Sequence, residues 1–105
     1  EPEPDVLILR PRADRYRAAL PGPGDVLLVV EVAKSSLDYD RAVKAPLYAA
    51  AGVPEFWLVD LVHAGVEMHR APADGAYDRV ERATVGELAP AALPVATVDV
   101  AALFA

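Results

Sequence analysis

The chain has 105 residues, of which 54% are hydrophobic and 25% are charged, and its formal net charge is −6. This length allows one folded domain and leaves no room for a second, so we expect a single domain over residues 1–105. The composition is that of a globular protein and excludes an intrinsically disordered chain. The acidic balance argues against a broad electrostatic surface for nucleic acid, although bound cations can neutralise a local site.

The chain contains no cysteine, which excludes disulfides, thiolate zinc sites and cysteine nucleophiles. No apolar run approaches the roughly 20 residues that a membrane-spanning helix needs. The opening EPEPD lacks the basic region of a signal peptide, and we therefore expect a cytoplasmic protein. Because the chain begins at Glu1 and a strand-like run follows almost at once, we also expect an N-terminal truncation.

Two strands are predicted in the first third of the sequence. Residues 5–9, DVLIL, follow Pro4, which suits the beginning of a strand. A surface loop comes next, with one short helical turn expected at residues 14–20. The run 25–33, DVLLVVEVA, is apolar almost throughout. This character predicts a central strand that is buried on both faces.

A helix is predicted over residues 37–51, with Ser36 as its N-cap and Gly52 at its end. Pro46 lies inside this pattern and should kink or split the helix, because proline lacks a backbone donor. Further strands are expected at residues 55–61, 66–70 and 77–83, with turns at 62–65 and 71–76 and the last strand at an edge. The tail ends in a short helix capped by Asp99. This order predicts an α/β or α+β fold with a mixed sheet.

Glu31 is the exception within the central apolar strand. An ionisable group there needs a partner, because removing a charge from water costs several kcal/mol. The leading interpretation is a metal site, with Asp5 and Lys44 as partners of Glu31. The structural alternative is an ion pair between Glu31 and either Lys34 or Lys44.

The sequence resembles the PD-(D/E)XK nuclease superfamily. It is similar, more closely, to a bacterial family of restriction endonuclease type that was long catalogued as a domain of unknown function. The resemblance covers nearly the whole chain. The segments that carry it are Pro4-Asp5-Val6, Leu28-Val29-Val30-Glu31-Val32, Ser35-Ser36-Leu37-Asp38-Tyr39-Asp40-Arg41, Lys44, Leu47-Tyr48-Ala49, Ala51-Gly52-Val53-Pro54-Glu55-Phe56-Trp57-Leu58-Val59-Asp60 and the C-terminal run 100–104.

This resemblance implies a restriction endonuclease-like mixed sheet flanked by helices, and hydrolysis of DNA with Mg²⁺ or Mn²⁺. Asp5 and Glu31 would be the carboxylate ligands of the cation, since such cations prefer oxygen donors. Lys44 would orient the attacking water and stabilise charge on the phosphate. In the superfamily at large the lysine stands two residues after the acid, where this chain has Ala33. The closer family takes its lysine from the following helix, which is the place of Lys44, and Lys34 is the rival.

The resemblance further implies a helix and a strand ahead of the Pro-Asp motif, with one more acidic residue near the metal. Because the sequence opens on the Pro-Asp motif, we expect this layer to be missing. A sheet without that layer would leave an apolar face uncovered, which favours a homo-oligomer such as a dimer. The alternative function is therefore a catalytically inactive domain of this fold that serves interaction or dimerisation.

Other polar positions receive structural interpretations. Asp40 and Lys44 are spaced as an i,i+4 pair, which is common on solvated helix faces. Tyr48 lies on the same stripe and is expected to pack rather than to catalyse. His63 and His69 are expected to be surface histidines rather than metal ligands.

Overall fold

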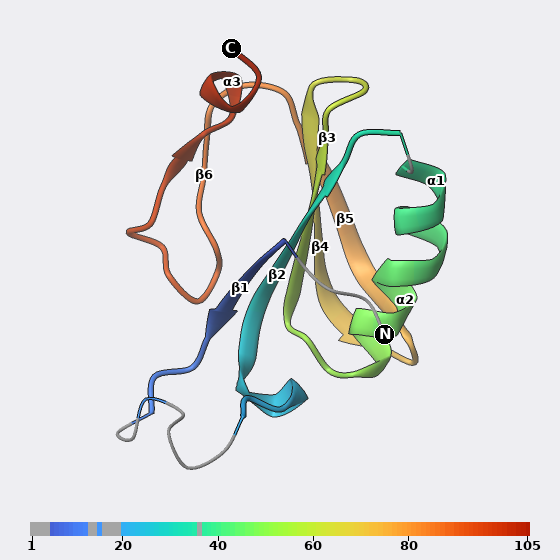
Figure 1. The fold of residues 1–105 in the computed structure, drawn as a ribbon, viewed down its shortest axis with the longest axis vertical. Coiled ribbons are helices and arrows are strands. Elements are labelled where there is room, and N and C mark those ends of the chain that lie inside the picture. Colours follow the sequence, from blue (N-terminus) through green and yellow to red (C-terminus); the bar gives the residue numbers. More distant parts are fainter. Residues whose placement is uncertain (1–4, 13–14, 16–19, 36) are drawn as a thin grey trace.

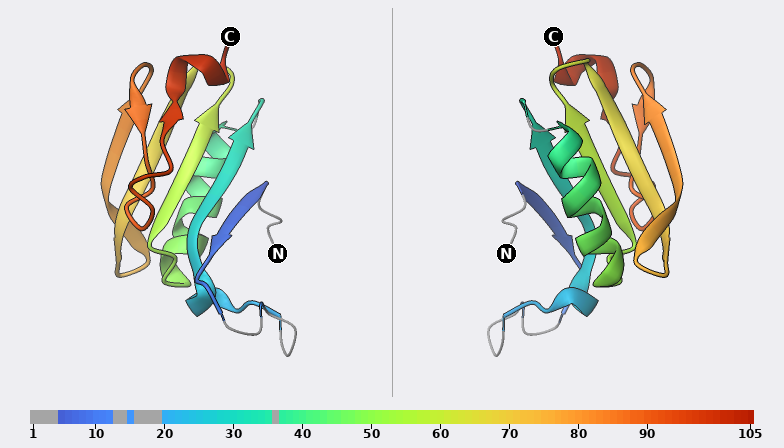
Figure 2. Two further views of the ribbon diagram at one scale, coloured as in Figure 1. Left: turned by 90° about the vertical axis from the view of Figure 1, so that its left-hand side faces the viewer. Right: turned by 90° about the vertical axis from the view of Figure 1, so that its right-hand side faces the viewer.

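The computed structural model describes residues 5–12, 15, 20–35 and 37–105. Its centre is a five-stranded mixed sheet with the order β1-β2-β3-β4-β5 (Figure 1). The strands are β1 (Val6–Leu9), β2 (Val26–Ala33), β3 (Glu55–Asp60), β4 (Gly65–Ala73) and β5 (Ala76–Ala83). Helices cover one face of this sheet, and the C-terminal segment lies against the other face (Figure 2). The predicted α+β class with a mixed sheet is confirmed.

The sheet is antiparallel except at its centre. There β2 runs parallel to β3, whereas the β1–β2, β3–β4 and β4–β5 pairs are antiparallel. A parallel pair needs a crossover connection, which the helical segment between β2 and β3 supplies. Every residue of β3 is buried, because this strand has neighbours on both sides and cover on both faces. The interior position predicted for residues 25–33 is confirmed.

The crossover contains a π-helical turn that the sequence pattern did not predict. Its three pieces are α1 (Leu37–Tyr39), the π-helix η2 (Asp40–Lys44) and α2 (Ala45–Ala50). The Ala45 N–H donates to the Asp40 carbonyl, five residues back, as a π-turn requires. Pro46 follows at the start of α2 and has no N–H for the next α-helical bond. The expected split is thus present, whereas the predicted cap at Ser36 lies outside the described residues.

The predicted helix end at Gly52 is confirmed. Gly52 has φ +79°, a left-handed conformation that residues with a side chain adopt only at a cost. Its N–H donates to the Ala49 carbonyl, and the N–H of Val53 donates to the Tyr48 carbonyl, both at 3.0 Å. This pair of bonds is a Schellman motif, which satisfies the last helix carbonyls and directs the chain into β3.

The C-terminal segment covers the sheet face opposite the helices. It contains β6 (Glu87–Leu88), β7 (Val98–Asp99) and α3 (Val100–Leu103). Val100 is fully buried there and packs with Trp57 and Met68. The predicted cap is confirmed, since Asp99 Oδ1 accepts from the Ala101 N–H at 3.2 Å. The pairing of β6 with β7 was not predicted.

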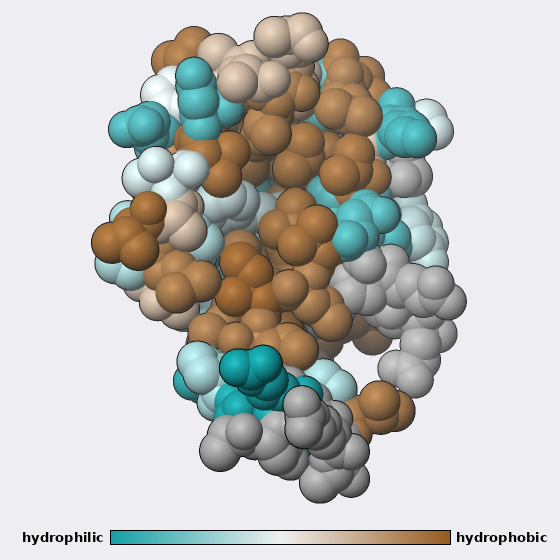
Figure 3. Space-filling view, turned by 60° about the vertical axis from the view of Figure 1, so that its left-hand side comes forward, coloured by the Kyte–Doolittle hydropathy of each residue, from teal (hydrophilic) through white to brown (hydrophobic). Residues whose placement is uncertain are grey.

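Part of this second face stays open beside β1 and β2. Strand alternation and register place Val6 and Val32 on it, and they are 50% and 38% exposed. Ile8 and Val30 are partly buried against the same apolar cluster. Figure 3 shows apolar side chains gathered across this side of the molecule.

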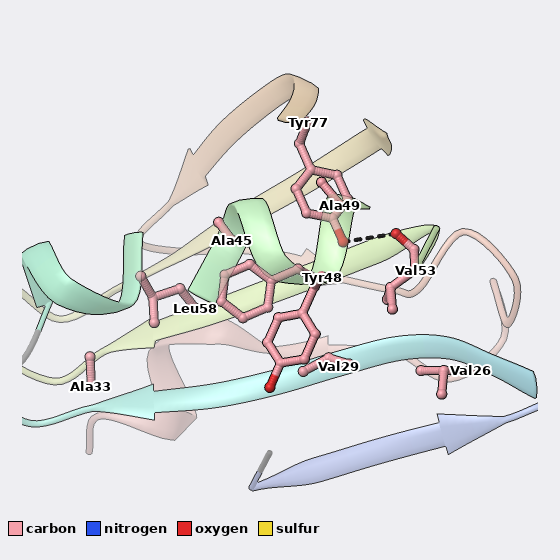
Figure 4. Packing of buried hydrophobic residues seen from close by; sticks show 10 residues of the cluster. Val26, Val29, Ala33, Ala45, Tyr48, Ala49, Val53, Leu58 and Tyr77 are labelled. Carbon is pink, nitrogen blue, oxygen red and sulfur yellow. Dashed lines mark hydrogen bonds between the residues drawn. The ribbon is translucent and has the colours of Figure 1, made fainter. Parts of the chain in front are cut away.

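The helix face holds the larger apolar cluster, shown in Figure 4. Phe56 is fully buried at its centre, with ring centroids 5.3 Å from Tyr48 and 6.5 Å from Tyr77. The Tyr77 hydroxyl donates to the Val53 carbonyl at 2.8 Å, so its polar atom is satisfied inside the cluster. This packing fixes the helical segment above β2 and β3.

Two local predictions differ from the structure or fall outside it. The turn expected at residues 71–76 is present but shorter than predicted, because β4 continues to Ala73 and β5 begins at Ala76. The chain reverses at Asp74 and Gly75, whose positive φ values of 52° and 77° match a tight hairpin turn. The helical turn expected at residues 14–20 lies outside the described residues except for Arg15 and Leu20.

Candidate active site

Glu31 lies beneath the helical segment with 2% of its surface exposed. The Tyr48 hydroxyl donates to Glu31 Oε2 at 2.7 Å, and Lys44 Nζ lies 3.4 Å from Glu31 Oε1. Both partners come from the crossover, so the folding of η2 and α2 onto the sheet creates these contacts. The carboxylate is therefore compensated by the partner that the sequence suggested, Lys44, and by a tyrosine for which only packing was expected.

Lys44 bridges two buried carboxylates. Its Nζ also lies 3.2 Å from Asp40 Oδ1, and Asp40 is only 2% exposed. The interpretation of Asp40 and Lys44 as a solvated pair is therefore wrong, because the π-turn directs Asp40 inward. Burial lowers the pKa of Lys44, but the hydrogen bonds and charges of Asp40 and Glu31 outweigh burial and raise this pKa. Burial and the neighbouring Glu31 raise the pKa of Tyr48, which keeps its hydroxyl protonated.

Asp5 lies next to this group at the start of β1. The antiparallel register pairs Val6 with Val30, so one further step places Asp5 across from Glu31. Asp5 is exposed, and its Oδ2 accepts from the Val32 N–H at 2.7 Å. Its charge also contributes to the raised pKa of Tyr48. The structure thus brings the three sequence-predicted site residues into one neighbourhood.

The donor set can be compared with the needs of a hard divalent cation. In the described residues, no group of three or more His, Cys, Asp or Glu side chains is arranged to hold a metal ion. Mg²⁺ commonly takes one or two protein carboxylates and completes its shell with water and phosphate oxygens. Asp5 and Glu31 fit that pattern, because they supply two carboxylates at adjacent positions of neighbouring strands. Lys34, the rival lysine, is exposed just after β2.

A second ionic cluster, not predicted from the sequence, is centred on Glu67 of β4. Arg41 binds both oxygens of Glu67, with Nε 3.1 Å from Oε1 and Nη2 on Oε2. His69 Nε2 lies 3.1 Å from Glu67 Oε1. The expectation of a surface His69 is wrong, since it is 4% exposed beneath the helices. Alternation along β4, which separates Glu67 and His69 from Val66 and Met68, is the signal that could have found this cluster.

His63 is at the surface, as predicted, with its side chain 63% exposed. Its Nδ1 lies 3.0 Å from Oδ2 of the buried Asp60, whose Oδ1 accepts from the Val62 and His63 N–H groups. Arg82 Nη1 lies 3.2 Å from the same Oδ2. Burial raises the pKa of Asp60, but the hydrogen bonds and charge of His63 and the hydrogen bond from the Val62 N–H outweigh burial and lower it. This arrangement is a turn motif at the end of β3 rather than an open site.

A mixed sheet that carries Asp5 and Glu31 on neighbouring strands, under a helix that supplies Lys44, is a restriction endonuclease-like fold. The chain belongs to the Uma2 family, described as "Putative restriction endonuclease", whose profile matches residues 1–101. The resemblance found in the sequence is therefore confirmed, and the family suggests a nuclease that binds DNA. No curated protein matches the sequence significantly. None of the helices in the described residues has the length and apolar character to cross a membrane.

Proposed function

We propose that this protein is a metal-dependent endonuclease that hydrolyses DNA phosphodiester bonds. The observation that carries this proposal is the convergence of Lys44 on Glu31, at 3.4 Å, beside Asp5 on the neighbouring strand. A buried acid and an adjacent acid on one sheet face, with a lysine from the helix above them, are groups that cation-assisted phosphodiester hydrolysis can use. The family assignment supports the same reaction class.

The local charge supports a cation in this place. Glu31 and Asp40 are both buried, Asp5 is close by, and Lys44 supplies the ammonium that lies between the buried pair. Glu31 is thus buried among other carboxylates, and a further positive charge beside it would be electrostatically favourable. A divalent cation bound between Asp5 and Glu31 would supply that charge.

Each residue of the site would have a distinct role in this reaction. Asp5 and Glu31 would hold Mg²⁺ or Mn²⁺, which would supply a Lewis acid for the phosphate and lower the pKa of a bound water. Lys44 keeps its proton, because Asp40 and Glu31 raise its pKa above the ordinary value. Its role is therefore to stabilise charge on the phosphate and to orient water, and it is not the general base.

A plasmid-nicking assay with Mg²⁺ or Mn²⁺ tests this proposal. We expect the wild type to nick DNA, and Glu31→Gln and Lys44→Met each to lower the rate by roughly a hundredfold or more, as loss of a charge-stabilising group does. Lys34→Met is the matched lysine control and Asp78→Asn the matched acid control, since both residues are exposed. Equal nicking by the wild type, Glu31→Gln and Lys44→Met would overturn the proposal.

The second candidate is a catalytically inactive domain that dimerises. It is favoured by the occupation of both Glu31 oxygens by Tyr48 and Lys44, and by the apolar surface that includes Val6 and Val32 (Figure 3). Calorimetry with Mg²⁺ and Mn²⁺ and sedimentation of the protein separate the two candidates. The inactive domain would be supported if the protein binds neither cation and forms a dimer that the Val32→Lys substitution dissociates. A monomer that binds the cations would contradict it.

A further inference from the structure

The π-turn η2 has a geometric effect on the three crossover side chains near Glu31. An α-helix turns by about 100° per residue, so positions eight apart drift about 80° from a common line. A π-turn is wider, so four residues across it fall short of a full turn, whereas four residues of α-helix overshoot one. In this chain the step from Asp40 to Lys44 crosses the π-turn η2 and falls short of a full turn. The step from Lys44 to Tyr48 follows α2 and overshoots a full turn, so the two angular deviations oppose each other. These angles should place Asp40 and Tyr48 on the same face of the helical segment, and both residues are indeed buried.

We propose that Asp40 is a positioning residue that holds the Lys44 ammonium against Glu31. The proposal rests on the function given above, in which Lys44 faces the phosphate. Asp40 contacts Lys44 Nζ at 3.2 Å, a shorter distance than the 3.4 Å to Glu31. The nuclease assignment does not itself give Asp40 any role.

The surroundings of Asp40 suit such a role. A lysine side chain is long and flexible, so a single distant contact leaves its ammonium poorly fixed. Asp40 is buried, and its side chain is therefore restrained where the Lys44 side chain is still 23% exposed. The next residue, Arg41, binds Glu67 on β4, which ties the same π-turn to the sheet at a second point. The turn thus presents a fixed carboxylate to a mobile ammonium.

Nuclear magnetic resonance of the lysine ammonium groups tests this proposal without any substrate. In the wild type we expect a slowly exchanging Lys44 ammonium signal with a scalar coupling between Nζ and the Asp40 carboxyl carbon. In Asp40→Asn we expect that signal to broaden or vanish through fast exchange, with the fold retained by circular dichroism. Asp78→Asn, which removes an exposed acid of β5 outside the π-turn, should leave the signal unchanged. An unchanged Lys44 signal in Asp40→Asn would overturn the proposal.

The wild-type measurement decides the matter even if Asp40→Asn does not fold. An assigned Lys44 ammonium without coupling to Asp40, or one that exchanges too fast to be seen, would also overturn the proposal. In the nicking assay, Asp40→Asn should lower kcat about tenfold and leave KM for DNA unchanged. If the wild type does not nick DNA, the proposed function fails, whereas the Lys44 signal still shows whether Asp40 holds the ammonium.

Discussion

Glu31 of β2 and Glu67 of β4 lie in one row of the sheet, on either side of Leu58 in β3. Each receives a cation from the same π-turn, Lys44 on Glu31 and Arg41 on Glu67. The helical crossover is therefore attached to the sheet at two points that span three strands. The position of Lys44 over Glu31 consequently depends on a contact made with β4, outside the candidate site.

Replacing Arg41 should destabilise the protein through Glu67. Arg41→Met leaves a buried carboxylate without its bidentate donor, and we expect a loss of about 1–3 kcal/mol in the free energy of unfolding. The half-exposed guanidinium keeps the loss below that of a fully buried pair. Urea unfolding measures it, with the more exposed Arg79→Met as the control. Equal losses in the two variants would contradict the role of Arg41.

Tyr48→Phe tests the hydroxyl that satisfies Glu31. The change removes one oxygen atom and leaves Glu31 Oε2 buried without its 2.7 Å donor. The unsatisfied acceptor should cost about 1–3 kcal/mol in the free energy of unfolding. Tyr39→Phe makes the same chemical change at an exposed position and should cost little. Urea unfolding of both variants makes the comparison, and a stable Tyr48→Phe would show that water or another group replaces the hydroxyl.

Glu55 anchors the C-terminal segment to the sheet. Its buried carboxylate accepts from Trp57 Nε1 at 2.6 Å, Arg70 Nε at 2.8 Å and the Ala91 N–H at 2.9 Å. Glu55→Gln turns an amide group toward at least one of these donors, and we expect a loss of about 3 kcal/mol. Hydrogen exchange at the Ala91 amide should accelerate in parallel. Glu87→Gln, at an exposed position of β6, is the control and should leave both measurements unchanged.

His69 should make stability depend on pH. Burial lowers its pKa below 6.5, and this effect exceeds the attraction of the imidazolium to Glu67. The unfolded chain therefore takes up a proton first as the pH falls through 6.5, and the free energy of unfolding decreases from there down to the folded-state pKa. The contribution of Glu67, whose pKa Arg41 holds below 4.5, is lost only in more acidic solution.

Thermal unfolding across this pH range measures the effect. We expect His69→Gln to flatten the decrease that begins at pH 6.5 and to leave the steeper acid limb in place. An identical slope in the wild type and in His69→Gln would contradict the assignment of this decrease to His69.

The elements that the sequence predicted are those whose signals are local. Each of them depends on a few neighbouring residues. They are the apolar run of β2 with Glu31 inside it, the helix end at Gly52 and the cap at Asp99. The proximity of Asp5 to Glu31 followed from the resemblance, and the register confirms that their strands are neighbours.

The features that were missed depend on contacts between distant segments. His69 is a polar residue and was therefore expected at the surface, but the helical crossover covers the sheet face on which it lies and buries it. Strands β6 and β7 have two residues each, too few for a periodic pattern, and form only because the tail folds back on itself. The π-turn shifts Asp40 from the solvated face to the sheet, and spacing alone cannot distinguish a π-turn from an α-turn.

The parallel pairing of β2 with β3 has a kinetic consequence. Strands β3, β4 and β5 are joined by short hairpins, whereas β2 meets β3 only after the whole crossover has closed a longer loop. The sheet should therefore grow from the three hairpin strands, and the neighbourhood of Glu31 should assemble late. Interactions that form after the transition state act mainly on the unfolding rate. Substitutions around Glu31 should thus shorten the lifetime of the native state while leaving the speed of refolding nearly unchanged.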